Sequence, residues 1–249
     1  MRLTRCHVAL ALEVGARVVL PEGAAAHLTR VLRLRPGDGC VLFNGDGCDY
    51  AATLVATSKR ESVVEIDSAR EVGNESPLHI TLVQGIARGE KMDLILQKAT
   101  ELGVAAFMPV MAERTEVKLD ADRAVKRMAH WSSVIGSACE QSGRARVPAL
   151  TAAMPLGDAL HAVDGSSLLL TLDPNGEFGI GSLPPPAGAR ATIAIGPEGG
   201  WSPRDREQLR AAGFVGLRLG PRVLRTETAG LAAIAALQAR FGDLGGVEA

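Results

Sequence analysis

Three turn-rich segments in the last third of the chain have the residue types of a small-molecule binding site. They are residues 170–174 (LTLDP), 195–202 (IGPEGGWS) and 219–229 (LGPRVLRTETA). Each continues an apolar stretch of β-strand type, and ligands of open parallel sheets bind beyond the carboxyl ends of the strands. Glycine lets the backbone approach a ligand closely and adopt positive φ. Turn formation alone is the alternative explanation, but three such segments in succession favour a binding site.

The second segment leads directly into a predicted helix. Ser202 is a capping residue, Pro203 suits the first turn, and Asp205 lies three positions after the cap. The N–H groups at the start of a helix lack partners within the helix and attract negative charge. We therefore expect N–H groups to face the mouth of the site.

Other chemical signatures are absent from the sequence. Residues 45–47 and 179–181 lack the third glycine of a dinucleotide fingerprint, and residues 85–91 do not have the spacing of a P-loop. There is no G-x-S-x-G or H-E-x-x-H motif. The four cysteines are not spaced as zinc ligands and are expected to be buried free thiols in a reducing cytosol. We expect no metal.

The elements that position the three segments alternate between strand and helix from residue 78 onward. Strands are predicted at residues 78–83, 104–110, 167–172, 191–195 and 215–219. Helices are predicted at residues 91–102 and 120–142, from Ser202 to the glycine at 213, and at residues 226–241. Continuous apolar strands between helices predict an α/β fold with a parallel sheet covered on both faces.

The first 72 residues follow a different, β-rich pattern. Short strands are predicted at residues 17–20, 39–43, 48–54 and 63–66, with a short helix at residues 24–34. The sequence NGDG at residues 44–47 is a strong hairpin turn signal. A polar, turn-rich stretch at residues 70–77 marks the expected domain boundary.

Composition limits the classes of partner and the compartment. The 249 residues carry 27 basic and 28 acidic side chains, which argues against a general polyanion binder but leaves room for a local basic patch. No apolar run is long enough to span a membrane. The N-terminus has a short apolar stretch after an arginine, but Glu13 and Arg17 interrupt it, unlike a signal peptide. We expect a cytoplasmic protein.

The second and third segments closely resemble the signature pair of a known enzyme family. Similar stretches precede them in the same order, at residues 27–47, 84–104 and 140–148, so the resemblance covers nearly the whole chain. By these motifs the chain resembles the SPOUT class of methyltransferases. Within that class it resembles the family that methylates N3 of a uridine in small-subunit (16S) ribosomal RNA.

This resemblance implies a C-terminal methyltransferase domain at residues 73–249, with a trefoil knot around a parallel sheet. It implies a small PUA-like β-barrel at residues 1–72 for RNA, a homodimer whose seam uses the last helix, and S-adenosylmethionine as cofactor. The substrate would be 16S rRNA or the small ribosomal subunit. The matching cofactor-side positions are Leu172, Pro174, Gly196, Glu198, Gly199, Leu219, Gly220, Leu224 and Thr226.

Two charged residues are the predicted catalytic groups for that reaction. Uracil N3 must lose its proton before it can accept a methyl group, so the site needs a base, a cation that stabilises the anionic ring, or both. Arg225 is the predicted cation, with structural pairing to Glu227 or Glu198 as the alternative. Glu198 is a base, a ligand of the cofactor's amino group, or a cap of the next helix. The base stays unassigned.

Basic residues spread along the chain are the RNA-binding candidates, each with a solvated surface charge as the alternative. They are Arg5, Arg30, Arg33, Lys91, Arg114, Arg144, Arg146 and Arg222. Aromatic residues for base stacking are few. Trp201 alone lies beside the predicted pocket, where packing at a helix start is an equally good explanation.

Two other functions remain open from the sequence. One is a SPOUT enzyme that methylates a ribose 2′-oxygen of RNA. The other is a non-catalytic RNA-binding protein of ribosome assembly that has kept the fold. Binding of S-adenosylmethionine separates the last from the first two, and nucleoside analysis separates the two enzymes.

Overall fold

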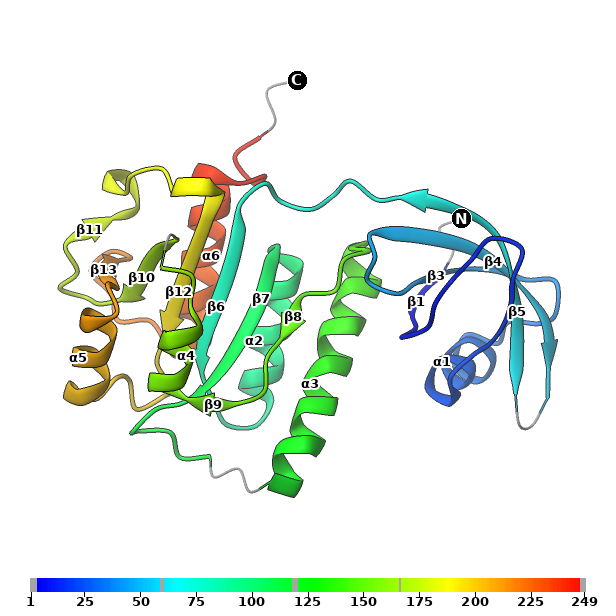
Figure 1. Cartoon of the computed structure of the whole chain (residues 1–249), viewed down its shortest axis with the longest axis horizontal. Helices are drawn as coiled ribbons and strands as arrows, with labels where there is room; N and C mark the ends of the chain where they lie inside the picture. Colours follow the sequence, from blue (N-terminus) through cyan, green and yellow to red (C-terminus); the bar gives the residue numbers. More distant parts are fainter. Residues whose placement is uncertain (1–3, 59–60, 118–120, 166, 247–249) are drawn as a thin grey trace. The chain divides into compact units, whose positions relative to one another are not determined.

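The computed structural model describes residues 4–58, 61–117, 121–165 and 167–246 of the chain, which form two compact units (Figure 1). The first unit contains the described residues up to Glu75 together with Gly136–Val147. The second contains Ser76–Ile135 and the described residues from Pro148 onward. The sequence predicts a single change of domain after residue 72 and does not anticipate that residues 136–147 group with the first unit.

The first unit is built on a five-stranded sheet with the order β1-β3-β4-β5-β2. Its strands are β1 (Arg5–His7), β2 (Arg17–Val19), β3 (Gly39–Phe43), β4 (Cys48–Thr57) and β5 (Ser62–Glu71). The predicted hairpin is confirmed: β3 pairs antiparallel with β4 across the NGDG turn, where Gly45 and Gly47 have φ of 97° and 100°. Closure of this sheet into a barrel stays a prediction.

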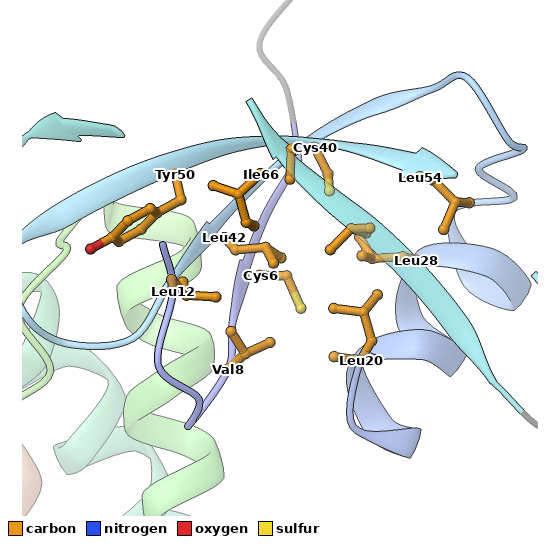
Figure 2. Close-up of a cluster of buried hydrophobic side chains, with 13 residues drawn as sticks. Cys6, Val8, Leu12, Leu20, Leu28, Cys40, Leu42, Tyr50, Leu54 and Ile66 are labelled. Atoms are coloured by element: carbon orange, nitrogen blue, oxygen red, sulfur yellow. The ribbon is translucent and has the colours of Figure 1, made fainter. Parts of the chain in front are cut away.

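A short helical segment packs on this sheet. The predicted helix at residues 24–34 is shorter in the structure, with α1 at Glu22–Ala26 continuing as a π-helical turn at His27–Val31. Leu28 from this turn enters a core with Cys6, Cys40 and Leu42, as Figure 2 shows. Burial raises the pKa of Cys6 to about 12 and that of Cys40 to about 11, so both are protonated at neutral pH.

The second unit is built on an eight-stranded sheet in which every strand pairing is parallel, as the sequence predicts. The order is β11-β13-β10-β12-β6-β7-β8, and β9 also pairs with β7. The strands are β6 (His79–Gly85), β7 (Val104–Met111), β8 (Ala149–Leu150), β9 (Met154–Pro155), β10 (Leu168–Leu172), β11 (Phe178–Gly179), β12 (Arg190–Ile195) and β13 (Val215–Arg218).

Helices pack on both faces of this sheet. They are α2 (Glu90–Glu101), α3 (Ala121–Ser142), α4 (Leu156–Ala162), α5 (Pro203–Ala211) and α6 (Thr226–Phe241). Residues of α4 and α5 share a core with Val83 and Ala194 of the sheet, whereas α2 and α6 pack on each other and on β7 and β12 (Figure 1). The sequence missed α4, β1 and the very short strands, because segments of two to seven residues carry too little periodicity.

Helix α3 supplies residues to both units. Its residues up to Ile135 belong to the second unit, and its residues from Gly136 belong to the first. Across the described residues, no helix is long and apolar enough to cross a membrane. The trefoil knot implied by the family resemblance stays a prediction.

Candidate functional site

A cavity of about 290 Å³ opens at the carboxyl ends of β10, β12 and β13. The three segments singled out in the sequence supply its walls. Its lining includes Leu172, Pro174, Gly196, Glu198, Leu219, Gly220, Leu224, Arg225 and Thr226. Of the predicted cofactor-side positions only Gly199 is not in the lining, because it faces Arg114 instead. The tertiary fold therefore brings the three loops to one place, where parallel strands end together.

The loop at residues 196–201 requires glycine at several positions. A Cβ at Gly196 would lie 3.1 Å from the backbone of Gly200 and Trp201, and Gly200 has a φ of +64°. The backbone nitrogen of Pro197 would lie 2.5 Å from a Cβ at Gly85. Side chains at these positions would therefore open the loop or push it away from the end of β6.

Trp201 is buried and also contributes to the cavity wall. Its indole N–H donates a 3.0 Å hydrogen bond to Thr171 Oγ1 at the end of β10. Trp201 therefore packs in the core at the start of helix α5, and its buried ring leaves little surface for stacking on a flat substrate.

The start of helix α5 is closed by its own side chains. Ser202 Oγ accepts the N–H of Asp205, and the Asp205 carboxylate accepts the N–H of Ser202 at 2.9 Å. The predicted cap is confirmed, but it occupies N–H groups that the sequence analysis left free for a ligand. The buried Asp205 also adds negative charge at this helix end.

Glu198 is held in its ionised form beside the cavity. Burial opposes its charge, but the backbone N–H groups of Arg88 and of Glu198 itself, together with Lys91, outweigh burial and lower the pKa of Glu198 below 4.5. The Arg88 N–H donates to Glu198 Oε1 at 3.0 Å, and Lys91 Nζ lies 3.5 Å from the same oxygen. Glu198 does not cap helix α5, and its lowered pKa makes it a weak base at neutral pH.

Two further residues hold the same loop, one from helix α2 and one from the turn after β7. Lys91 lies between Glu198 and Glu227, with its Nζ 4.0 Å from Glu227 Oε2. Arg114, which follows β7, donates to the carbonyl oxygen of Gly199 at 3.1 Å. Lys91 and Arg114 were predicted to bind RNA. In the structure, Lys91 pairs with Glu198 and Arg114 donates to Gly199, so both residues hold this loop.

Arg225 lies at the rim of the cavity and is the N-cap residue of helix α6. Its carbonyl oxygen accepts the N–H groups of Thr228 and Ala229, while its side chain is exposed and has no ion pair within the described part of the chain. The alternative pairing with Glu198 or Glu227 is not formed, because those carboxylates face Lys91. The Arg225 guanidinium is thus available to a ligand.

The first loop is held by charge and by close backbone packing. Asp173 Oδ2 pairs with Arg206 Nη1 of α5 at 3.0 Å, and both residues line the cavity. The backbone of Gly216 would lie 2.6 Å from a Cβ at Gly176. Arg206 was not predicted as a lining residue, because a position inside helix α5 gives no signal of the cavity it faces.

The predicted RNA-binding arginines divide into exposed and buried groups. Arg30, Arg33 and Arg222 are exposed, and Arg222 also lines the cavity. Arg146 is exposed, and its guanidinium lies against the turn at Gly47. These positions are compatible with contact to phosphate groups.

Arg5 and Arg144 are corrections to the RNA-binding set, since both are in the interior of the first unit, 9% and 5% exposed. Arg144 forms a bidentate pair with Glu75. Arg5 pairs with Asp49, donates to the carbonyl oxygens of Cys139 and Arg144, and stacks 4.5 Å from the centre of the Phe43 ring. A guanidinium committed in this way cannot reach a phosphate without breaking the core.

The cavity combines apolar walls with separated charges. Leucines of the first and third loops and Ile195 at the start of the second form the apolar part. Glu198 contributes a negative charge, and Arg222 and Arg225 contribute exposed positive charges. Such a surface suits a ligand that joins a flat apolar group to a zwitterion. Over the described residues, no cluster of three or more His, Cys, Asp or Glu side chains has an arrangement that could hold a metal ion.

Comparison with known proteins identifies relatives along nearly the whole chain. The profile of an RNA methyltransferase domain matches residues 74–238, and that of an RNA methyltransferase PUA domain matches residues 20–67. The ribosomal RNA small subunit methyltransferase E of Bacillus subtilis is 33% identical over 221 residues, 85% of each chain. The protein of that name from Buchnera aphidicola is 30% identical over 98% of each chain.

Solved structures of high similarity carry a bound nucleoside cofactor. A ribosomal RNA small subunit methyltransferase E from Neisseria gonorrhoeae, bound to S-adenosylmethionine, is 42% identical with a TM-score of 0.92, covering 98% of this chain and all of that one. A Legionella pneumophila methyltransferase in complex with the same cofactor is 38% identical, with a TM-score of 0.91 over 98% of this chain and 100% of that chain.

Proposed function

Because the chain belongs to the RNA methyltransferase family, we propose that it transfers a methyl group from S-adenosylmethionine to N3 of a uridine in small-subunit ribosomal RNA. The observation that carries this proposal is the cavity at the strand ends, with an arginine at its rim that has no ion pair among the described residues. The relatives named ribosomal RNA small subunit methyltransferase E support the class of substrate.

The residues of the cavity fit the proposed cofactor. Leu172, Leu219 and Leu224 offer apolar contact to an adenosine, and the loop backbones offer hydrogen-bond donors and acceptors close to it. The ionised Glu198 matches the ammonium of the methionine part. When bound, the sulfonium supplies an activated methyl group, so the protein's tasks are alignment and control of charge and protons.

Arg225 is the proposed catalytic cation. Loss of the N3 proton leaves negative charge shared with the uracil oxygens, and a fixed guanidinium near one of them stabilises that charge as it develops. The exposed, unpaired side chain of Arg225 can take this position without breaking an existing ion pair in the described structure. A cation aimed at developing charge raises the rate without binding the neutral base more tightly.

Glu198 is assigned to recognition of the cofactor and not to proton removal. An effective general base has a pKa near the pH of the reaction. The hydrogen bond from the Arg88 N–H and the charge of Lys91 move the pKa of Glu198 in the opposite direction. The same contacts fix the carboxylate at the cavity wall, which suits a binding role.

The exposed arginines are the residues for which we propose contact with RNA. The exposure of Arg30, Arg33 and Arg222 supports phosphate contacts, and we propose further contacts from the N–H groups of Lys91 and Arg114 that reach solvent. A ribosomal substrate places the reaction in the cytoplasm. We also propose the homodimer implied by the family resemblance, with the partly exposed alanines of α6 at its seam.

Two measurements test the proposed function. Calorimetry with S-adenosylmethionine is expected to show binding by the purified protein, and absence of binding by folded protein would favour a non-catalytic assembly factor. Nucleoside analysis of small-subunit rRNA from cells lacking the gene is expected to show loss of 3-methyluridine, restored by the wild-type gene. Loss of a 2′-O-methylated nucleoside instead would exclude the uracil-N3 reaction.

A further inference from the structure

Gln84 is a fully buried polar residue directly beneath the cavity. It occupies the carboxyl end of β6, is 0% exposed, and does not itself line the cavity. Its Nε2 donates a 2.8 Å hydrogen bond to the carbonyl oxygen of Gly85 and a longer one, 3.4 Å, to Thr226 Oγ1. Thr226 Oγ1 in turn donates to the carbonyl oxygen of Gly196 at 2.6 Å.

The direction of each hydrogen bond in this chain is fixed. The Gly85 carbonyl oxygen only accepts, so the NH₂ group of Gln84 must face it and Thr226. The Thr226 hydroxyl donates its proton to the carbonyl oxygen of Gly196 and accepts a hydrogen bond from Gln84 Nε2. These three hydrogen bonds therefore join the end of β6, the first residue of α6 and the loop that follows β12, all beside the cavity.

The oxygen of the same side-chain amide accepts no hydrogen bond from the described residues. Gln84 Oε1 has no hydrogen-bond partner among the described residues, and a Cβ at Gly230 of α6 would lie 3.9 Å from it. A buried unpaired acceptor destabilises a protein, whereas an apolar side chain of the same shape is close to neutral. Stability alone therefore does not account for a glutamine here. Of its two donated hydrogen bonds, to the Gly85 carbonyl oxygen and to Thr226 Oγ1, only the second reaches a residue that lines the cavity.

We propose that Gln84 is a positioning residue for the cofactor pocket: it orients the Thr226 hydroxyl, which fastens Gly196 of the second loop to the start of helix α6. This inference rests on the proposed function, because it takes S-adenosylmethionine as the ligand of the cavity. Without the amide donor, the Thr226 side chain is free to adopt another rotamer. The two loops are then less ordered before binding, and affinity falls because binding must order them.

The test compares two buried glutamines by replacing each with methionine, which is unbranched and of similar length. Gln84→Met is expected to weaken S-adenosylmethionine binding about five-fold by calorimetry, with the Tm of the ligand-free protein unchanged or raised. The control is Gln238→Met, since Gln238 is also 0% exposed but lies toward the other end of α6 from Thr226 and does not line the cavity. It donates to the Leu102 carbonyl oxygen and accepts from Ser76. Gln238→Met is expected to lower Tm and to leave the Kd for S-adenosylmethionine unchanged.

A double-mutant cycle separates positioning through Thr226 from a general structural effect. Thr226→Val removes the hydroxyl and is expected to weaken cofactor binding, and Thr226→Ser, which keeps it, to retain most of the affinity. Adding Gln84→Met to Thr226→Val is expected to change the Kd by less than about two-fold. An undiminished effect of Gln84→Met in that background overturns the proposal.

The remaining outcomes are also decisive. Unchanged cofactor affinity in Gln84→Met overturns the role of Gln84 and leaves the proposed function intact. A fall in Tm as large as that of Gln238→Met shows a structural role and likewise overturns it. Absence of cofactor binding by the folded wild-type protein overturns both the proposed function and this inference.

Discussion

Arg144 in the first unit and Arg225 in the second occupy opposite environments. Arg144 is 5% exposed and forms a bidentate pair with Glu75, next to Arg5, which is paired with Asp49. Arg225 is exposed, and the two carboxylates considered as its partners, Glu198 and Glu227, face Lys91. Both residues lie in family-like segments of the sequence, and nothing in their local sequence distinguishes them.

The contrast separates a guanidinium that holds the fold from one that is free to act. A buried arginine must be paired and hydrogen-bonded, and removing one partner leaves an uncompensated charge in the interior. An exposed arginine without a partner contributes little to stability, so its charge is available to a ligand. Substitution of an arginine is thus expected to have different effects in the two units. Substitutions at three arginines test this, and one at Glu198 tests the carboxylate that faces Lys91 in place of Arg225.

The largest effect is expected from Arg225→Ala. Loss of the cation that stabilises the developing charge on uracil is expected to reduce kcat about 100- to 1,000-fold. Tm and the Kd for S-adenosylmethionine are expected to change little, because the side chain is exposed and unpaired in the described structure. Single-turnover methylation of small-subunit rRNA, with Arg225→Lys as a charge-preserving comparison, measures this. Full turnover in folded Arg225→Ala removes its catalytic role.

Arg144→Ala tests the opposite side of the comparison. Breaking its pair with Glu75 in the interior is expected to lower the free energy of unfolding by about 3 kcal/mol, measured by denaturant titration. The matched control is Arg70→Ala: Arg70 is 77% exposed and lies 3.4 Å from Asp49, and its loss is expected to change stability by less than about 1 kcal/mol. Equal losses in the two variants would contradict the assignment of Arg144 to the core.

Arg222→Ala is expected to have a moderate effect on RNA binding. Loss of one phosphate contact reduces the slope of log affinity against log salt by about 1 and weakens binding similarly for all RNA sequences. Arg218→Ala, an exposed arginine that does not line the cavity, is the control and is expected to change the slope less. Filter binding at several salt concentrations gives both slopes, and equal slopes for Arg222→Ala and wild type would exclude the contact.

The smallest effect is expected from Glu198→Gln and depends on pH. The contacts of Glu198 lower its pKa in the folded protein below the ordinary 4.5, so they stabilise the fold above that pH and are lost as pH falls through the folded value. The difference in Tm between wild type and Glu198→Gln is therefore expected to be present at pH 7 and to shrink below pH 4.5. A constant difference across this range would show that the charge of Glu198 does not stabilise the loop.

Much of the fold was predictable because its elements are long and regular. The apolar strands and helices from residue 78 onward have clear periodicity, and the structure confirms their type and, within a few residues, their bounds. The cap at Ser202 and the hairpin at residues 44–47 were predictable for a different reason, since each depends on side chains only a few positions apart.

The candidate site was predictable in its location and less so in the state of its residues. Parallel strands end at the same edge of a sheet, so the three loops after β10, β12 and β13 were expected at one edge. They meet in one cavity because these three strands are neighbours in the sheet. Whether Glu198 was a base, a helix cap or a binding group depended on Arg88 and Lys91, which lie more than a hundred positions away in sequence.

The sequence by itself determined the parallel α/β unit, the β-rich first unit and the family, because periodicity, turn signals and motifs are local patterns. Only the tertiary structure decided which arginines are buried, which carboxylates are paired and how Gln84 reaches Thr226. Burial and charge pairing are set by residues distant along the chain. Arg144 and Arg225 differ through such neighbours and through no feature of their own segments.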